Sequence, residues 1–381
     1  MLNNQKKINI IKMIVVLVFM INSLNSYCLM SANKIPDKRN NSLRILDINV
    51  WSGLTYKGIV KMGEYESPAI REQRYRALVT QIKQLDPDII GIHEANKLPD
   101  YAKRLADSLG YNYFYHIGLG GIRLGKVGLP WNLREGDIIL TKKYLNPEWA
   151  GRKQLLGGYV GRWASFNFSD ASQVIAVKIT FRNTPIFLFT THWHASLSDS
   201  PLIINRINEM YNKGLITKAE SDDIILKIKK SVKQRMIETK KTLEFINKIA
   251  SNHPFILMGD CNAEPSSKEI KTLIQNKLVD VFYTVHPDTN SFTWDPRSNI
   301  NIKKHYLKDN CNQNDINVYN EIEYFTRKIP KRIDYIFLGP VSCLKSGIIK
   351  LKSTRIVMKK IINGIQASDH YGVLTDIEIN Q

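Results

Sequence analysis

Several short apolar runs of this 381-residue sequence end in, or begin after, side chains that can bind a cation or move a proton. These side chains are carboxylates, amides and imidazoles: Asn49, Glu94, His192, His194, Asp260, Asn262, Asp334, Asp369 and His370. Active sites of layered α/β proteins gather at strand ends, where loops converge on one rim. One polar residue after a buried strand is unremarkable, but a series of them predicts a functional site.

These residue types suit the hydrolysis of a phosphate ester. Water attacks a phosphodiester anion poorly unless a cation neutralises the phosphoryl oxygens. Oxygen ligands such as the Glu94 carboxylate and the Asn49 amide suit Mg²⁺, with Mn²⁺ and Ca²⁺ as alternatives. The sequence has no Cys/His cluster at zinc spacing, which argues against a zinc site. A carboxylate must take the proton of the attacking water, and an imidazole held by a carboxylate is suited to proton transfer.

Short strands must position these side chains. Apolar runs of four to ten residues predict strands at Leu43–Trp51, Ile89–His93, Val174–Phe181, Ile186–His192, Phe255–Gly259, Arg332–Leu338 and Gly372–Ile379. Amphipathic spacing predicts helices at Arg71–Leu85, Tyr101–Leu109, Lys233–Ala250 and Lys268–Asn276. Strands interleaved with helices indicate an α/β layered domain.

Two stretches look like insertions or covers. Residues 111–136 combine glycines with aromatic side chains, and residues 197–232 hold two apolar groups on either side of Gly214, among lysines. One interpretation is contact with a lipid surface or a substrate. The other is structural, with residues 197–232 forming a packed helical hairpin on the surface.

Charge and the N-terminus suggest where the protein works. The formal net charge of +19 attracts polyanions such as nucleic acid, anionic lipid surfaces or phosphorylated substrates, unless it reflects a general composition bias. Residues 1–32 place lysines before the apolar run Met13–Ile21 and then small residues, which is typical of a secretory signal peptide. We therefore expect a secreted or periplasmic protein, with an uncleaved membrane anchor as the alternative.

Each motif is weak alone, but their order resembles the endonuclease/exonuclease/phosphatase superfamily. Its signals are an Asn after the first strand, a Glu after the second, T-H, G-D-x-N, R-x-D-Y and a closing S-D-H, and this chain has all six in order between residues 43 and 379. The resemblance implies one catalytic domain over residues 33–381, with a helical insertion at about 197–232. It also implies a four-layer sandwich of two packed mixed β-sheets flanked by helices, and we expect a monomer.

The resemblance also implies roles. Asp260 would be the general base, Asn262 would orient phosphate or water, and His192 would donate hydrogen bonds to the non-bridging oxygens. His370, steered by Asp334, would be the general acid/base or a phosphate contact. The alternative for Asp334 is a structural salt bridge to Arg332.

The metal ligands implied by the resemblance are Glu94 and Asn49, while Asp369 either binds metal or orients the cluster. His194 lies two residues after His192 and either lines the substrate pocket or packs. His93, His116, His253, His286 and His305 match no motif, and we interpret them as surface or core.

Finer resemblance favours a lipid headgroup over nucleic acid as substrate. L-R-I-L-D-I-N-V-W, T-H-W-H-A, a helix opening with Arg235, S-F-T-W-D-P-R-S-N and S-D-H-Y-G-V look like segments of neutral sphingomyelinases. One departure is E-G-D-I-I-L-T-K, where Asp137 intrudes at a place at which family members often have a Gly-rich stretch just before a strand. The expected activity is therefore that of a sphingomyelinase or phospholipase C-like phosphodiesterase with peripheral membrane contact.

Two alternatives stay open. A secreted deoxyribonuclease-like nuclease agrees with the positive charge, because phosphate contacts dominate nucleic-acid affinity, although the basic residues are dispersed along the chain. A non-catalytic family member that binds phosphoinositides or proteins is disfavoured by the intact residues Glu94, Asp260, Asn262 and His370.

Overall fold

The computed structural model describes residues 41–53, 66–119, 122–124, 127–129, 134–160, 164–166, 171–289, 291–306 and 318–380. The predicted signal peptide, residues 1–32, lies outside these ranges. Among the described helices, none is both long and apolar enough to cross a bilayer.

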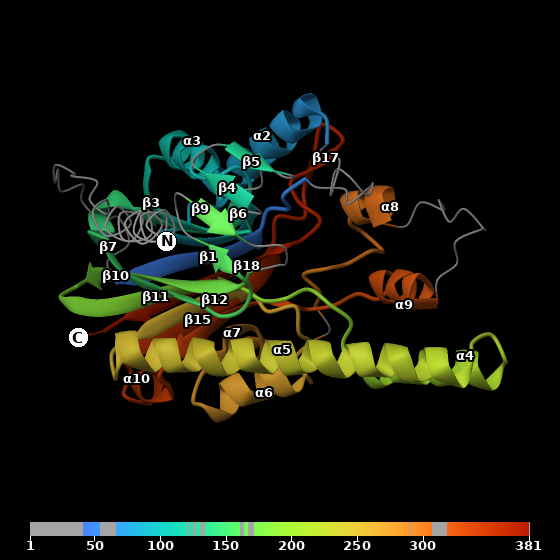
Figure 1. The fold of residues 1–381 in the computed structure, drawn as a ribbon. Helices are drawn as coiled ribbons and strands as arrows, with labels where there is room; N and C mark the ends of the chain where they lie inside the picture. The colour runs from blue at the N-terminus through green and yellow to red at the C-terminus, as the bar shows by residue number, and fades with distance from the viewer. Residues whose placement is uncertain are drawn as a thin grey trace, which may run out of the picture.

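Two six-stranded mixed sheets form the centre of the molecule (Figure 1). The first sheet has the order β15-β18-β1-β2-β6-β3, and the second β13-β14-β12-β11-β10-β7. The first contains β1 (Ser42–Asn49), β2 (Ile89–Ala95), β3 (Tyr111–Leu119), β6 (Glu135–Lys142), β15 (Ile349–Val357) and β18 (Gly372–Ile379). The second contains β7 (Glu148–Gln154), β10 (Gln173–Phe181), β11 (Thr184–His192), β12 (Phe255–Asp260), β13 (Val279–Asp280) and β14 (Asp334–Gly339).

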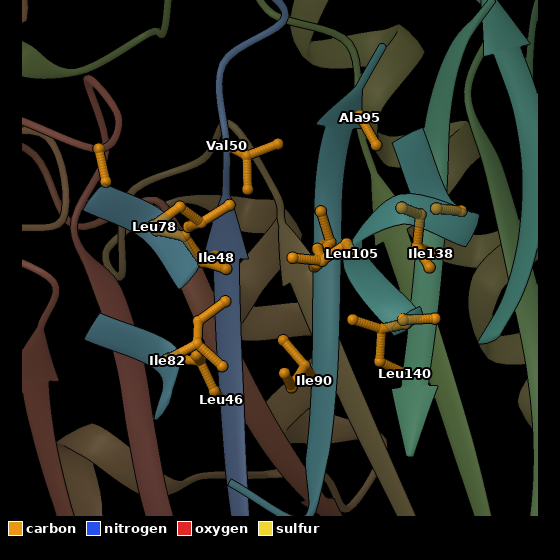
Figure 2. Close-up of a cluster of buried hydrophobic side chains, with 14 of the residues drawn as sticks. Leu46, Ile48, Val50, Leu78, Ile82, Ile90, Ala95, Leu105, Ile138 and Leu140 are labelled. Carbon is orange, nitrogen blue, oxygen red and sulfur yellow. The ribbon is translucent and has the colours of Figure 1, made fainter. Parts of the chain in front are cut away.

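Helices cover the outer faces of both sheets. Side chains of α2 (Pro68–Leu85) and α3 (Asp100–Leu109) meet those of β1, β2 and β6 in one apolar cluster, as Figure 2 shows for Leu46, Ile48 and Leu78. On the other side, α5 (Lys218–Ala250) and α6 (Lys268–Gln275) pack on the second sheet. A third apolar cluster fills the space between the sheets. The predicted four-layer sandwich of two mixed sheets flanked by helices is confirmed.

Smaller elements surround the sandwich. Short helices are η1 (Lys143–Leu145), α4 (Pro201–Asn212), α7 (Val281–Val285), α8 (Ile300–Tyr306), α9 (Val318–Arg327) and α10 (Val341–Lys345). Short strands are β4 (Ile122–Leu124), β5 (Val127–Leu129), β8 (Tyr159–Val160), β9 (Ala164–Phe166), β16 (Ile361–Ile362) and β17 (Ile365–Gln366).

The inner face of the sandwich changes from apolar to polar along each central strand. Alternate residues of a strand share one face, so Leu43, Ile45, Asp47 and Asn49 of β1 follow one another on the inner face. Leu43 and Ile45 belong to the inter-sheet core, whereas Asp47 and Asn49 are polar and fully buried. Each buried aliphatic side chain stabilises the packed sheets by about 1.5–3 kcal/mol. Burial of Leu43 and Ile45 therefore offsets part of the free-energy cost of burying Asp47 and Asn49.

One helix is longer than its pattern indicated. The prediction began a helix at Lys233 and placed Arg235 in its opening turn, but α5 begins at Lys218, so Arg235 lies in its interior. Thr217 caps the helix: its hydroxyl accepts from the Glu220 N–H while the Glu220 carboxylate accepts from the Thr217 N–H. This capping box was the signal that would have located the start.

Part of the expected cover at residues 111–136 is instead an edge strand of the first sheet. Residues 111–119 form β3, which pairs antiparallel with β6. Tyr113 and Tyr115 stack on one face with ring centroids 6.2 Å apart, and Phe114 stacks on Trp149 at 6.4 Å on the other. Aromatic residues on both faces hid the period-two pattern of a strand.

Candidate active site

Asn49 and Glu94 reach the site from β1 and β2. The backbone of Glu94 has φ +56°, at an irregularity in the pairing of β2 with β6, so the strict alternation of β2 ends there. The Asn49 amide nitrogen donates to Glu94 Oε1 at 2.8 Å and to Asp260 Oδ2 at 3.0 Å. Its oxygen accepts from the Trp51 N–H at 2.9 Å. In this arrangement Asn49 holds the two carboxylates together.

Three strands of the second sheet bring their polar residues into register. Asp260 is the direct cross-strand partner of His192 on β11 and of Asp334 on β14. Asp260 is fully buried, and its Oδ1 accepts the backbone N–H of Asn262 at 3.0 Å. His192 Nε2 lies 3.7 Å from Asp260 Oδ2. Residues 68 or more positions apart in the chain thus meet because their strands are neighbours.

The Asp334 carboxylate accepts from His370. Nδ1 of His370 lies 2.9 Å from Asp334 Oδ2 and 3.8 Å from Asp260 Oδ2. Burial opposes the charged imidazolium, but the two carboxylates outweigh it, so the pKa of His370 is raised well above its ordinary value. Arg332 pairs with Asp280 at 2.8 Å instead. The alternative of an Asp334–Arg332 salt bridge is therefore wrong.

The T-W dipeptide of the segment S-F-T-W-D-P supports this pair. The Thr293 hydroxyl accepts the backbone N–H groups of Ile333 and Asp334 at 3.1 and 3.2 Å. The Trp294 ring meets His370 edge-on, with centroids 5.3 Å apart. Sequence reasoning noted this segment only as a resemblance and did not assign it a role.

His192 is the most accessible imidazole of the cluster. Its side chain is 21% exposed, against 6% for His370. Asn262 has φ +46°, and its amide nitrogen lies 3.1 Å from His192 Nε2 and 2.9 Å from the Trp193 carbonyl oxygen. Asn262 and His192 therefore form the edge of the site that meets solvent.

Asp369 and Glu94 form a negative pair suited to a hard cation. Burial raises the pKa of the Asp369 carboxyl to about 6, and the charge of Glu94 adds to this against the opposing effect of His370. Asp369 accepts from Ser368 and Tyr306, and Glu94 accepts from Asn49 and Ser52. Within the described chain, neither carboxylate forms an ion pair with a Lys or Arg. Oxygen donors with uncompensated charge are what Mg²⁺ requires, so these residues fit the cation.

A second set of ligand atoms lies beside the first. Atoms of Asp260, Asp334 and His370 come within 4.8 Å of one another. The imidazole of His370 already neutralises part of this set through its 2.9 Å contact with Asp334. Among the described residues, no imidazole is hydrogen-bonded to the Glu94–Asp369 pair, so its oxygens suit a cation better than those of the second set do.

His194 lines a cleft at the site. The cleft of about 100 Å³ also includes His192, Glu94 and Glu135. The backbone N–H of His194 donates to both oxygens of Glu238 on α5, at 3.1 and 3.3 Å. Burial raises the pKa of Glu238 to about 7, against the opposing hydrogen bonds and the charge of Arg235. Glu238 thus holds the backbone of His194, and His194 also lines the cleft.

The structure adds one buried histidine to the site that the sequence did not single out. His93 is fully buried, with Nε2 2.8 Å from Asp47 Oδ1 and Nδ1 3.2 Å from Asp137 Oδ1. Its ring centroid lies 6.1 Å from that of His192. Burial opposes protonation, but the two carboxylates raise the pKa of His93 well above its ordinary value. Asp137, which interrupts the expected Gly-rich strand, is therefore the partner of a histidine on the neighbouring strand.

Comparisons place this geometry among known folds. No protein-family model matches the sequence, and no curated protein matches it. An endonuclease/exonuclease/phosphatase from Bacteroides vulgatus superposes with a TM-score of 0.54 at 14% identity, covering 90% of this chain and 100% of its own. D. rerio TDP2 complexed with single strand DNA product gives 0.53 at 14%, covering 88% and 99%. The human Nocturnin catalytic domain with bound sulfate anion gives 0.52 at 14%, covering 91% and 96%.

The chain has the endonuclease/exonuclease/phosphatase fold. The superfamily fold expected from the six ordered motifs is confirmed over most of the chain. At this level of identity the likeness establishes the fold and not the substrate. The resemblance to neutral sphingomyelinases stays a prediction.

Proposed function

We propose that this protein is a Mg²⁺-dependent phosphodiesterase that hydrolyses a phospholipid with a cationic headgroup, of the sphingomyelin type. The observation that carries the proposal is the convergence of Asn49, Glu94, Asp260, Asn262 and His370 on one rim, as the distances from Asn49 to Glu94 and Asp260 and from His370 to Asp260 show. The endonuclease/exonuclease/phosphatase fold supports it.

The residues have separable roles in this proposal. Bound by Glu94 and Asp369, the cation would neutralise charge on the phosphoryl oxygens. Asp260 takes a proton from the attacking water, and His192 with Asn262 donates hydrogen bonds to the non-bridging oxygens. The bond between phosphorus and the lipid alcohol oxygen breaks, and that oxygen takes a proton from His370. Asp334 keeps the imidazole of His370 in position through the 2.9 Å contact.

The charge of the cleft favours a lipid headgroup. The described residues that line it include the carboxylates of Glu94, Glu135 and Asp137 and the histidines His192 and His194, without any Lys or Arg. Negative walls repel the flanking phosphates of a nucleic-acid strand and attract a quaternary ammonium group. A zwitterionic phosphocholine headgroup carries a quaternary ammonium group beside its phosphate, so it suits a cleft with these charges.

A nuclease activity is the second candidate, and a specific observation favours it. A larger cleft of about 230 Å³, which also includes Glu94, is lined by Arg71, Arg74 and Arg104. Arginines along a cleft can bind the phosphates of a polyanion such as a nucleic-acid strand. A matched structure, D. rerio TDP2, was solved with a single strand DNA product. Arg74 is already paired with Glu66 and Arg104 with Glu72, which weakens this candidate.

The test is a comparison of substrates with purified protein. We expect phosphocholine release from sphingomyelin vesicles with Mg²⁺ and none after EDTA. Degradation of plasmid DNA without phosphocholine release would establish the nuclease instead. Absence of both activities, with binding of phosphoinositides, would favour the non-catalytic alternative.

Asp260→Ala is the control variant, and it should lose all measurable hydrolysis of either substrate. We further propose that the protein is secreted or periplasmic through residues 1–32 and acts as a monomer. N-terminal sequencing of exported protein would show cleavage near residue 32, and light scattering would give the mass of one chain.

A further inference from the structure

A tyrosine to which the proposed mechanism gives no role reaches the cation side of the site from α8. Tyr306 is the last residue of that helix, and its hydroxyl donates to Oδ2 of Asp369 at 3.2 Å. Asp369 is only 3% exposed, and together with Glu94 it would hold the cation. The Tyr306 hydroxyl is therefore in direct contact with a proposed metal ligand.

The other side-chain donor to the Asp369 carboxylate in the described chain is shared with a second acceptor. The Ser368 hydroxyl lies 3.2 Å from Asp369 Oδ1 but 2.7 Å from the carbonyl oxygen of Asn49. A serine hydroxyl has one hydrogen and cannot donate to both oxygens, and the contact with Asn49 is the shorter one. Among the described residues, the hydroxyl of Tyr306 has the Asp369 carboxylate as its acceptor. Tyr306 therefore restricts the rotation of this carboxylate more than Ser368 does.

Neighbouring side chains hold the ring of Tyr306 in place. Its centroid lies 5.3 Å from that of Trp294, and the Arg327 guanidinium lies 5.2 Å from it over the ring. The indole N–H of Trp294 donates to the Arg327 carbonyl oxygen at 3.4 Å, which joins the two neighbours to each other. The same indole packs against His370. The hydroxyl of Tyr306 is thus presented to Asp369 by a packed ring.

Buried amides attach the start of α8 to the loop that carries Asp369. Asn299 is fully buried, and its amide nitrogen donates to the carbonyl oxygens of Ser368 and Asp369 at 3.1 and 2.9 Å. The Asn301 amide nitrogen donates to the Gln366 carbonyl oxygen at 3.0 Å. The first turn of α8 therefore holds the backbone of Asp369, and the last residue of α8 holds its side chain.

We propose that Tyr306 is a positioning residue of the cation site, whose hydroxyl orients the Asp369 carboxylate for Mg²⁺. This inference rests on the proposed function, because that function places the cation at Glu94 and Asp369. Hydrogen bonds from neighbouring groups orient the carboxylates that bind metals, and loss of one such bond weakens metal binding by about 10–100-fold. Tyr306 takes no part in proton transfer, so it contributes to the affinity for the cation and not to the rate with the cation bound.

Calorimetric titration with Mg²⁺ in the absence of substrate tests this role. The variant Tyr306→Phe keeps the ring and removes the hydroxyl, and we expect its Kd for Mg²⁺ to be about tenfold higher than that of the wild type. The matched control is Tyr371→Phe. Tyr371 is 2% exposed and follows His370 directly, but its hydroxyl lies 2.9 Å from that of Ser298 instead of a carboxylate. The control should keep the wild-type affinity for Mg²⁺.

A second measurement separates positioning from a general structural role. Hydrolysis of the soluble diester bis(p-nitrophenyl) phosphate is followed as a function of Mg²⁺ concentration. We expect Tyr306→Phe to need more Mg²⁺ for half of its maximal rate, by the same factor as the change in Kd, and to reach the wild-type kcat at saturating Mg²⁺. A structural defect would lower kcat at every Mg²⁺ concentration.

Equal Mg²⁺ affinities of the wild type and Tyr306→Phe would overturn the inference and leave the proposed function intact. A loss of kcat that saturating Mg²⁺ does not restore, or an equal loss of affinity in Tyr371→Phe, would overturn it as well. A wild type that binds Mg²⁺ and hydrolyses no diester would reject the proposed function, while weaker Mg²⁺ binding by Tyr306→Phe would still support the positioning role. A wild type that binds no Mg²⁺ would reject both.

Discussion

Two histidines of this protein lie between the sheets, and both are held by carboxylates. His370 contacts Asp334 at 2.9 Å at the rim of the site, whereas His93 lies deeper between Asp47 at 2.8 Å and Asp137 at 3.2 Å. His370 is 5% exposed and His93 is not exposed at all. The chemistry of the two groups is alike, but their access to a substrate differs.

In the proposed mechanism, this difference suits His370 to proton transfer and His93 to positioning. A proton on His370 can pass to a substrate oxygen at the rim, because only one side of its ring is occupied by Asp334. Both ring nitrogens of His93 contact protein carboxylates, so His93 cannot pass a proton to a substrate. His93 instead compensates the charge of Asp47, whose pKa is raised to about 6 by burial despite the opposing effect of His93. This compensation lies close to Asp260, whose charge also raises the pKa of Asp47.

The largest effect is expected on kcat, from a change in the His370–Asp334 pair at the rim of the site. Asp334→Asn removes the charge that orients and protonates His370, and we expect kcat to fall about 10³-fold. The unfolding free energy should fall by only about 1–2 kcal/mol, since the amide can still accept one hydrogen bond from the ring. Steady-state hydrolysis and urea unfolding of the same preparation measure the two quantities. A variant with unchanged kcat would remove His370 from the proton transfer.

At the fully buried His93 we expect the opposite: a large loss of unfolding free energy rather than of kcat. His93→Leu leaves Asp47 without its histidine partner and Asp137 with only the hydrogen bond from Gln173, in a buried interior, which should cost about 3–5 kcal/mol of unfolding free energy. Urea denaturation measures the loss. The double variant His93→Leu with Asp47→Asn should recover part of it, and full additivity of the two changes would show that the groups do not interact.

A smaller effect is expected at Glu238. Its pKa in the folded protein is raised from 4.5 to about 7, so the folded state holds this proton more tightly than the unfolded state. The corresponding stabilisation is fully present below pH 4.5 and is lost as the pH rises through about 7. Glu238→Gln keeps an acceptor for the His194 N–H and should remove about 1–3 kcal/mol of this pH dependence. Thermal unfolding across this pH range tests it, and an unchanged slope would contradict it.

The smallest effect is expected for a change that makes the surroundings of His93 more like those of His370. Asp137→Asn leaves His93 with one hydrogen-bonded carboxylate, as His370 has in Asp334. We expect a loss of about 1–2 kcal/mol, since a neutral amide can still accept one hydrogen bond from the ring. Denaturant unfolding would measure it, and a loss as large as that of His93→Leu would show that Asp137 is the principal partner.

Residue order along the chain was enough to predict the strands that carry the site and the residues at their ends. Period-two alternation with a polar residue at the terminus is a local signal, and it located Asn49, His192, Asp260 and Asp334 correctly on β1, β11, β12 and β14. The fold class followed from the same local patterns. The start of α5 was wrong because charged residues in its first turns masked the apolar spacing.

Partners across strands were not predictable from local patterns. Asp137 looked like an intrusion until its strand β6 was seen beside β2, where it meets His93 across 44 residues of sequence. Arg332, two residues away, was the alternative partner of Asp334. Positions two residues apart share a strand face only while the strand continues, and β14 begins at Asp334. Sheet pairing directed Arg332 to Asp280 and Asp334 to His370.

The sequence by itself determined which residues carry chemistry and which segments carry them, because hydrophobic period and chain order are local properties. Only the tertiary structure decided that Asp47 and Asp137 face His93, which of two imidazoles reaches solvent, and that α4 and the first half of α5 project from the sandwich. Those facts depend on strand register and on the packing of two sheets, which join residues that the chain keeps far apart.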